Sequence, residues 1–333
     1  MDAFDVLSVG DVVVDEFIRL INENAHEFEN QQGKWLAIPF GVKIPFEKSI
    51  LLPAVGNASN ASVNFAKFGL KSGLISNVGH DKYGIEVLDA LHAKKVDNTL
   101  VRVNSGKLTN HHYVLWYKEE RTILIKHEAY DYYWPHLRAK EIPKWLYFSS
   151  ISGHAMGEYT DQICAWLSHN EAVKLAFQPG TFQLEAGTEK LKDIYKRTEI
   201  LILNREEAVI VSKHDSNEIH GLLDKLHALG PKSVIITDGP SGAYASDGTK
   251  RIKMPPYPDP KPPFERTGAG DAFASTLVAA LIKGYDFQAA LELAPISSMN
   301  VVQYVGAQEG LLSEHELIEL LKKAPRDYKI ENF

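Results

Sequence analysis

Short apolar runs of strand length alternate with segments of helical spacing along most of this chain. The apolar runs lie at residues 73–78, 146–149, 173–177, 200–203 and 234–237, and the run at 7–14 is interpreted as one buried strand ending near Asp15. Segments of helical spacing lie at 60–69, 82–95, 157–169, 205–212, 217–229, 272–283, 287–304 and 313–323. Because strands that alternate with helices usually form a parallel sheet covered on both faces, the pattern predicts an α/β fold with a mostly parallel central sheet.

Two segments, 34–52 and 110–127, break this alternation because they are strand-like and aromatic and contain no helical pattern. Within the second, residues 111–117 and 122–125 flank a charged stretch at 118–121, which is the pattern of a β-hairpin. The hairpin could extend the edge of the main sheet or belong to a small separate sheet.

Composition narrows the class of protein. The chain has 333 residues, of which 44% are hydrophobic and 24% charged, as in globular proteins with a large core. A formal net charge of −7 argues against a nucleic-acid partner. No apolar run reaches the roughly 18 residues of a membrane span, so we expect no membrane partner and a cytoplasmic protein. The single cysteine, Cys164, excludes an internal disulfide and a cysteine-based zinc site.

The most informative stretch is Thr267-Gly268-Ala269-Gly270-Asp271, where a proline-rich segment gives way to an Ala- and Leu-rich helix. The start of a helix has unpaired N–H groups and partial positive charge, so it attracts anions, and glycines let that backbone approach a phosphate. Asp271 would lie beside the anion, where it could take a proton from an attacking hydroxyl. The alternative is an ordinary capped helix in which Asp271 complements the helix dipole.

This sequence, Thr-Gly-Ala-Gly-Asp, resembles the signature of the PfkB-type carbohydrate kinases, the ribokinase-like family. The resemblance implies a single α/β domain over 1–333, a ribokinase-like three-layer sandwich with a small β-sheet lid. The lid would consist of two insertions at about 17–52 and 108–130. It would cover the substrate and pair two subunits in a homodimer, burying apolar side chains such as Phe40, Ile44, Trp116 and Ile123.

The resemblance also implies substrate-binding residues near the start of the chain. Asp15, five positions after Gly10, matches an acidic sugar ligand, although Val13 stands where ribokinases often have Asn. Gly56 and Asn60 match a Gly-Gly-x-x-x-Asn stretch whose first glycine is Val55 here. The alternatives are that Asp11 caps the end of the strand and that Asn60 is a helix N-cap.

Two further motifs would bind the nucleotide and its metal. Asn204 and Glu207 match an Asn-x-x-Glu motif linked to Mg²⁺ and phosphate, although the same spacing also fits a capping box. Thr237, Gly239 and Gly242 match a Thr-x-Gly-x-x-Gly nucleotide loop. Glu265-Arg266 replaces the Asp-Thr whose aspartate helps to hold a monovalent cation in ribokinases, so dependence on such a cation is left open.

The expected activity is magnesium-dependent transfer of the ATP γ-phosphoryl group to a hydroxyl of a sugar or a sugar phosphate. Asp271 would be the general base, and the backbone of Gly268, Ala269, Gly270 and Asp271 would form the anion hole. One alternative is a nucleoside kinase, in which rings of the aromatic-rich segment could stack on the base. The other is a non-catalytic, ligand-binding or regulatory protein with a kinase-like fold. His111 and His112 are interpreted as strand surface residues. The aromatic residues in question are Tyr113, Trp116, Tyr117, Tyr130, Tyr132, Tyr133 and Trp134.

Overall fold

A ten-stranded sheet forms the centre of the molecule in the computed structural model, which describes residues 3–31, 33–118, 120–213, 218–264 and 266–333. The strand order is β7-β6-β1-β10-β11-β12-β13-β14-β15-β16, parallel from β7 to β13 and antiparallel beyond. The mostly parallel sheet predicted from the alternating pattern is therefore confirmed. Its strands are β1 (Val6–Val9), β6 (Ser72–Gly79), β7 (Val101–Asn104), β10 (Trp145–Phe148), β11 (Lys174–Phe177), β12 (Thr198–Asn204), β13 (Ser233–Thr237), β14 (Ala243–Ser246), β15 (Arg251–Met254) and β16 (Glu331–Asn332).

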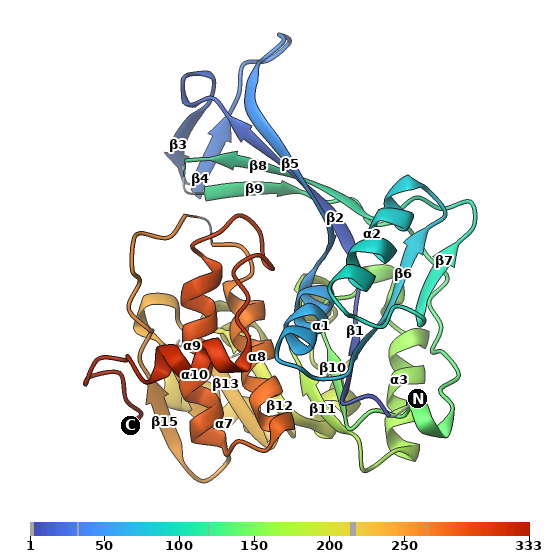
Figure 1. The fold of residues 1–333 in the computed structure, drawn as a ribbon, viewed down its shortest axis with the longest axis vertical. Coiled ribbons are helices and arrows are strands. Elements are labelled where there is room, and N and C mark those ends of the chain that lie inside the picture. The colour runs from blue at the N-terminus through green and yellow to red at the C-terminus, as the bar shows by residue number, and fades with distance from the viewer. Residues whose placement is uncertain (1–2, 32, 119, 214–217, 265) are drawn as a thin grey trace.

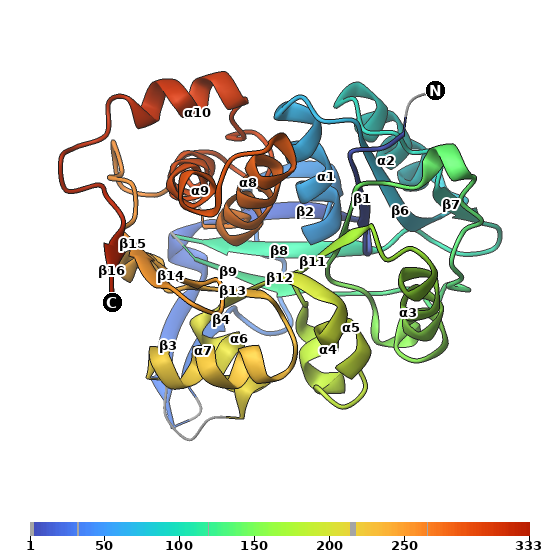
Figure 2. The ribbon, with the colours of Figure 1, turned by 90° about the horizontal axis from the view of Figure 1, so that it is seen from below.

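Helices cover both faces of the sheet and complete the three layers (Figure 2). One face is covered by α1 (Asn57–Lys67), α2 (Lys82–Ala93), α8 (Ala269–Lys283) and α9 (Phe287–Val301), with α10 (Glu314–Leu321) outside them. The other is covered by α3 (Glu158–His169), α4 (Thr181–Ala186), α5 (Lys192–Arg197), α6 (Arg205–Ser212) and α7 (Ile219–Ala228).

The core lies in two layers because successive side chains of each strand point to opposite faces. On β12, Ile200 and Ile202 pack with the α1, α8 and α9 layer, whereas Leu201 and Leu203 pack with α3, α5, α6 and α7. A strand buried on both faces must be apolar at nearly every position, which is why these strands appear in the sequence as continuous apolar runs.

A second, four-stranded sheet with the order β5-β2-β8-β9 stands over one edge of the main sheet (Figure 1). Its strands are β2 (Val13–Leu20), β5 (Phe46–Val55), β8 (His111–Tyr117) and β9 (Glu120–Leu124). A hairpin of β3 (His26–Asn30) and β4 (Gly33–Ala37) lies at its far end. We call the four-stranded sheet and this hairpin the lid. The two segments that break the alternation, 34–52 and 110–127, belong to the lid, so the 111–125 hairpin is not an edge of the main sheet.

The interpretation of residues 7–14 as one strand is wrong. The chain leaves the main sheet after Val9, where the Asp11 N–H donates to the Ser150 carbonyl at 2.9 Å, and β2 begins at Val13 in the lid. One apolar run thus serves two sheets, and hydrophobicity alone does not mark the change of direction between them.

Trp116 is not an exposed residue of the lid. Its side chain is only 2% exposed, the Arg19 guanidinium lies 4.4 Å from its ring centroid, and the Phe264 ring packs edge-on at 5.3 Å. The expectation that Trp116 is available to a partner subunit is therefore wrong. Phe40 and Ile123, by contrast, are exposed.

A buried polar contact fixes α1 against α8. The amide of Asn64 on α1 donates to the Ser275 hydroxyl at 2.7 Å and to the Thr276 hydroxyl at 2.8 Å, both on α8, and all three side chains are buried. Because unpaired buried polar groups are costly, this contact specifies how the two helices face each other.

We predict that Asn64→Ala lowers the free energy of unfolding by about 1–3 kcal/mol, because the buried Ser275 and Thr276 hydroxyls lose the hydrogen bonds that Asn64 donates. Urea unfolding followed by circular dichroism measures this change. Lys67→Ala, on the exposed last turn of the same helix, is the matched control and should have little effect. Equal stability of the Asn64 variant and the control would contradict the assigned role of this contact.

Candidate active site

A cleft of about 470 Å³ lies between the carboxyl ends of the parallel strands and the lid. In open α/β sheets this is the edge where ligands bind. Asp15, from the start of the lid, and Asp271, from the start of α8, line the same cleft. Ten of the predicted site residues line it: Asp15, Gly56, Asn60, Asn204, Glu207, Thr237, Gly268, Ala269, Gly270 and Asp271.

The first turn of α8 borders the cleft with free backbone donors. Gly268 is the N-cap residue with φ +81°, and a Cβ at that position would lie 2.3 Å from the Ala307 Cβ. The Ala272 N–H is the first to bond back along the helix, to the Gly268 carbonyl at 2.8 Å. No side chain caps this end among the described residues. The N–H groups of Ala269, Gly270 and Asp271 therefore remain available to an anion.

Asp271 is held from two sides. Its carboxylate accepts a hydrogen bond from the Asn60 amide of α1 at 2.8 Å and another from the Gln178 amide, just after β11, at 3.2 Å. Burial raises the pKa of the Asp271 carboxyl, and these two hydrogen bonds act in the opposite direction. The carboxyl is thus a stronger base than an exposed aspartate, and its orientation is fixed.

Asn60 is not the cap of its helix. Gly56 is the N-cap of α1, with φ +105°, and a Cβ there would lie 2.7 Å from the Asp11 carbonyl oxygen. The Asn60 amide oxygen accepts a hydrogen bond from Gln308 at 2.9 Å, which leaves its amide nitrogen to face Asp271. The capping alternative for Asn60 is excluded by this geometry.

The capping-box alternative for Asn204 and Glu207 is confirmed. The two residues form a capping box at the start of α6, with the Glu207 N–H donating to Asn204 Oδ1 at 2.8 Å and the Asn204 N–H donating to Glu207 Oε2 at 2.9 Å. Both also line the cleft. Burial raises the pKa of Glu207, so a bound cation there would favour its ionised form.

The nucleotide loop is only partly in the cleft. Thr237 ends β13 and lines it, whereas Gly239 and Gly242 lie in the turn beyond and do not. Gly242 has φ +91°, and a Cβ there would lie 2.2 Å from the Met254 carbonyl oxygen, so glycine is required by the packing of this turn. Arg266 lines the cleft, but its neighbour Glu265, at the position of the cation-binding aspartate of ribokinases, lies outside the described residues.

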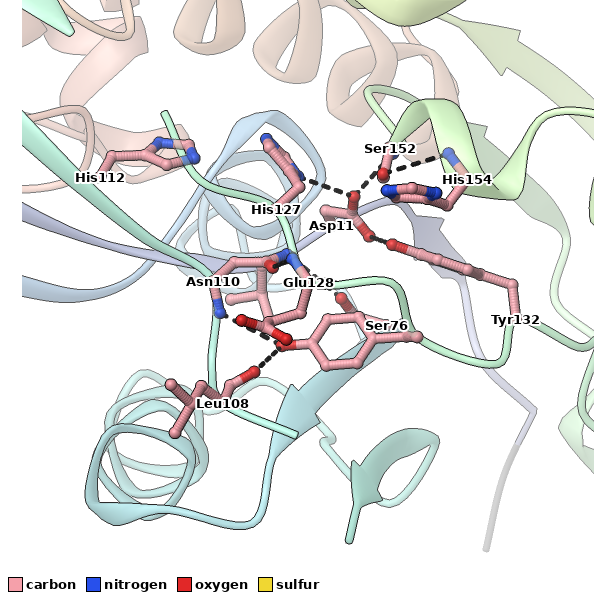
Figure 3. Close-up of polar contacts among 12 residues, drawn as sticks. Asp11, Ser76, Leu108, Asn110, His112, His127, Glu128, Tyr132, Ser152 and His154 are labelled. Carbon is pink, nitrogen blue, oxygen red and sulfur yellow. Dashed lines mark hydrogen bonds and ion pairs between the residues drawn. The ribbon is translucent and has the colours of Figure 1, made fainter. Parts of the chain in front are cut away.

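Sequence reasoning missed several lining residues, among them Gln178, His112 and His127. The interpretation of His112 as a surface residue is wrong: it lines the cleft and lies 3.3 Å from Asp15. In the β2–β8 register His112 pairs with Asp15, so the two side chains share one face of the lid. His127 lies beside Asp11 at 3.5 Å (Figure 3), in a segment that has no regular structure to predict from.

None of the seven aromatic residues considered for stacking on a nucleobase lines the described cleft. The Tyr132 hydroxyl donates to Asp11 at 2.8 Å, and the Tyr130 hydroxyl donates to the Leu108 carbonyl at 2.7 Å (Figure 3). Phe182 is the one phenyl, phenol or indole ring among the described lining residues.

No group of three or more His, Cys, Asp or Glu side chains is arranged to hold a metal ion in the ranges given above. Within the same ranges, every helix is too short or too polar to cross a membrane.

Known proteins are similar to this chain in architecture and in sequence. The chain is 26% identical over 269 residues to a ribokinase of Bacillus subtilis, covering 80% of this chain and 87% of the relative. It is 26% identical over 280 residues to a nucleoside kinase of Methanocaldococcus jannaschii, covering 80% and 85%. The structure of Arabidopsis thaliana ribokinase complexed with ribose and ATP superposes with a TM-score of 0.75 at 19% identity, covering 96% of this chain and 99% of that one.

The family comparison agrees with the signature at the start of α8. The description "pfkB family carbohydrate kinase" matches residues 46–314, which is most of the chain. With the ribokinase-like fold and the cleft at the edge of its sheet, this match shows that the chain belongs to the PfkB family of carbohydrate kinases.

Proposed function

We propose that this protein is an ATP- and magnesium-dependent kinase that transfers the γ-phosphoryl group to a hydroxyl of a sugar or a sugar phosphate. The observation that carries the proposal is the position of Asp271. This buried carboxylate is held by Asn60 and Gln178 next to the free N–H groups of α8, in the cleft that Asp15 also lines. A phosphoryl-transfer site needs a base and an anion-binding backbone in one place.

The residues divide the reaction between them. The acceptor hydroxyl oxygen bonds to the γ-phosphorus while the bond from that phosphorus to the bridging oxygen breaks, and ADP leaves. The hydroxyl proton passes to Asp271, whose raised pKa suits it to this role. The N–H groups of Ala269, Gly270 and Asp271 stabilise the charge on the transferred group.

Glu207 fits a magnesium site of the kind that kinases use. Mg²⁺ usually keeps several waters and needs only one or two carboxylates beside the phosphates, and Glu207 is a partly buried carboxylate on the wall of the cleft. When bound, magnesium neutralises phosphate charge. Asn204 holds the Glu207 side chain in place through the capping box, and Thr237 lines the cleft one strand further along the sheet.

The walls of the cleft favour a sugar over a nucleoside. A nucleobase is usually bound between aromatic or apolar faces, and Phe182 offers one such face. The polar groups Asp11, Asp15, Asn57 and Asn60 offer hydrogen bonds suited to several hydroxyls. A nucleoside kinase remains the second candidate because of the archaeal relative.

We predict that Asp271→Asn lowers kcat by roughly 10²–10⁴-fold while ATP still binds, since only the base is lost. Steady-state kinetics and calorimetric titration with ATP measure the two effects. Turnover at the wild-type rate would reject the assignment of the base.

The stability of the same variant provides its control. The folded-state pKa of Asp271 is raised, so the protonated form stabilises the fold at low pH, and that contribution is lost as pH rises through the folded-state pKa. Asn cannot ionise, so the thermal midpoint of the variant at pH 8 should equal or exceed that of the wild type. A lower midpoint would mean that the loss of activity reflects damage to the fold.

We predict opposite effects of alanine at two neighbouring glycines. A Cβ at Gly270 would meet no atom within 4 Å and would stand in the phosphate position, so Gly270→Ala should keep the stability but weaken ATP binding at least tenfold. Gly268→Ala should unfold more easily, because its Cβ would meet Ala307. Thermal unfolding and ATP titration of both variants test this, and unchanged ATP affinity of Gly270→Ala would contradict the anion hole.

We also predict a homodimer formed through the lid. Exposed apolar side chains gather on it, including Phe40 at 102% exposure and Phe46 at 53%, and such a patch usually marks an interface. Sedimentation velocity at micromolar concentration should show a dimer that Phe40→Asp dissociates. Ile210→Asp, an exposed position on α6, is the control. A monomeric wild-type protein would contradict the prediction.

A further inference from the structure

The charged side chains of the cleft are separated along the edge of the sheet. The order β1-β10-β11-β12-β13 sets a span of roughly 19 Å, four steps of about 4.8 Å. Asp11 follows β1 and Asp271 contacts Gln178 after β11, while Glu207 and Thr237 follow β12 and end β13. The acceptor therefore binds toward β1 and the nucleotide toward β13.

The two arginines that line the described cleft both lie away from β1. Arg266 comes just before Gly268 at the start of α8. Arg121 pairs with Trp116 in the β8–β9 register, and Trp116 packs on Phe264. In strand register and chain position, both residues are thus on the side where phosphates would bind.

Two carboxylate–imidazole pairs occupy the end near β1, and Figure 3 shows one of them, Asp11 with His127. The His112 Nδ1 lies 3.3 Å from Asp15 Oδ1, and the His127 Nδ1 lies 3.5 Å from Asp11 Oδ2. The two imidazole rings are neighbours, with their centroids 5.2 Å apart. We call these four side chains the acceptor cluster.

The acceptor cluster contains an enclosed nitrogen that needs a partner. The His112 Nε2 is buried without a hydrogen-bond partner among the described residues, although buried polar atoms are nearly always paired. His112 lines the cleft, so a bound molecule can supply this partner. The approaches of Nδ1 to the carboxylates are not hydrogen bonds, since Asp15 Oδ1 and His127 Nδ1 are also buried without a hydrogen-bond partner among the described residues.

The cluster is therefore rich in acceptors and, with neutral imidazoles, carries two negative charges. Such a site binds hydroxyl donors and disfavours a phosphate or carboxylate, which would lie beside Asp11 and Asp15 without a fixed cation.

We propose that Asp15–His112 and Asp11–His127 form a specificity site that selects a neutral, polyhydroxylated acceptor over its phosphorylated or carboxylated counterpart. The inference rests on the proposed kinase function and chooses between a sugar and a sugar phosphate. His112 Nε2 contacts an acceptor hydroxyl, and the two carboxylates accept hydrogen bonds from others.

Other titratable groups surround the cluster. Tyr132 donates to Asp11, and His154 lies on the same side of Asp11 in Figure 3. His111 pairs with Glu16 at 3.5 Å and belongs to the opposite face of the lid. Burial raises the pKa of Tyr132 far above its ordinary value, so this phenol keeps its proton and donates to Asp11.

The test compares matched acceptors by calorimetric titration of the full-length protein without nucleotide. The pairs are ribose and ribose 5-phosphate, fructose and fructose 6-phosphate, and glucose and gluconate. At pH 8 at least one neutral sugar should bind tenfold or more tightly than its anionic partner. Tighter binding of the phosphorylated or carboxylated member at pH 8 would overturn the proposal, and so would no binding of any neutral sugar at millimolar concentration.

Variants assign the effect to the cluster. His112→Ala should weaken binding of the neutral sugar at least tenfold, and His112→Gln, whose amide reaches the Nε2 position, should restore part of it. His111→Ala is the matched control and should bind as the wild type does. Unchanged sugar binding by His112→Ala would overturn the proposal.

Failure of this inference is distinguishable from failure of the proposed function. ATP-dependent phosphorylation of a sugar phosphate with undiminished affinity at pH 8 would overturn the specificity site and leave the kinase intact. Selective binding of a neutral sugar without phosphoryl transfer would support the site and reject the kinase.

Discussion

The hydrogen bond between Asn60 and Asp271 joins the two parts of the chain that build the proposed reaction centre. One is the segment after the lid strand β5, and the other is the start of α8, more than 200 positions later. The contact depends on how α1 and α8 face each other, which the buried amide of Asn64 and its two hydroxyl partners determine. It depends also on Gly268, whose lack of a Cβ lets the first turn of α8 approach Ala307. Chemistry at residue 271 is therefore a consequence of helix packing.

The lid is tied to the same edge of the sheet by the change of direction after β1. Because the chain turns at Asp11, the next carboxylate, Asp15, lies in the lid while still lining the cleft. The strand register then places His112 opposite Asp15. A lid that moved relative to the main sheet would move these two side chains together. Closure of the cleft and contact with the acceptor would therefore occur together.

Local patterns in the sequence predicted the sheet and most of its helices, because strands buried on both faces must be apolar. They also predicted the residues at the start of α8, where proline, glycine and a helix-forming run follow one another. Local patterns do not show which residues far apart in the chain are in contact. Gln178 contacts Asp271 across 93 positions and has no motif of its own. The prediction that Trp116 is exposed was wrong. An aromatic residue of a strand can be exposed or, as here, covered by an arginine and a neighbouring ring. Asn204 and Glu207 show that one spacing can serve a helix cap and a cleft wall together.

The proposed activity requires that one cleft place a buried base and an anion-binding helix start beside the acceptor hydroxyl. Phosphorus NMR of the wild-type protein with ATP, magnesium and a panel of sugars measures this activity. We expect one new phosphate-ester resonance to grow in step with ADP, and only when a suitable sugar is present. Release of inorganic phosphate alone, or no consumption of ATP with any sugar, sugar phosphate or nucleoside, would contradict it.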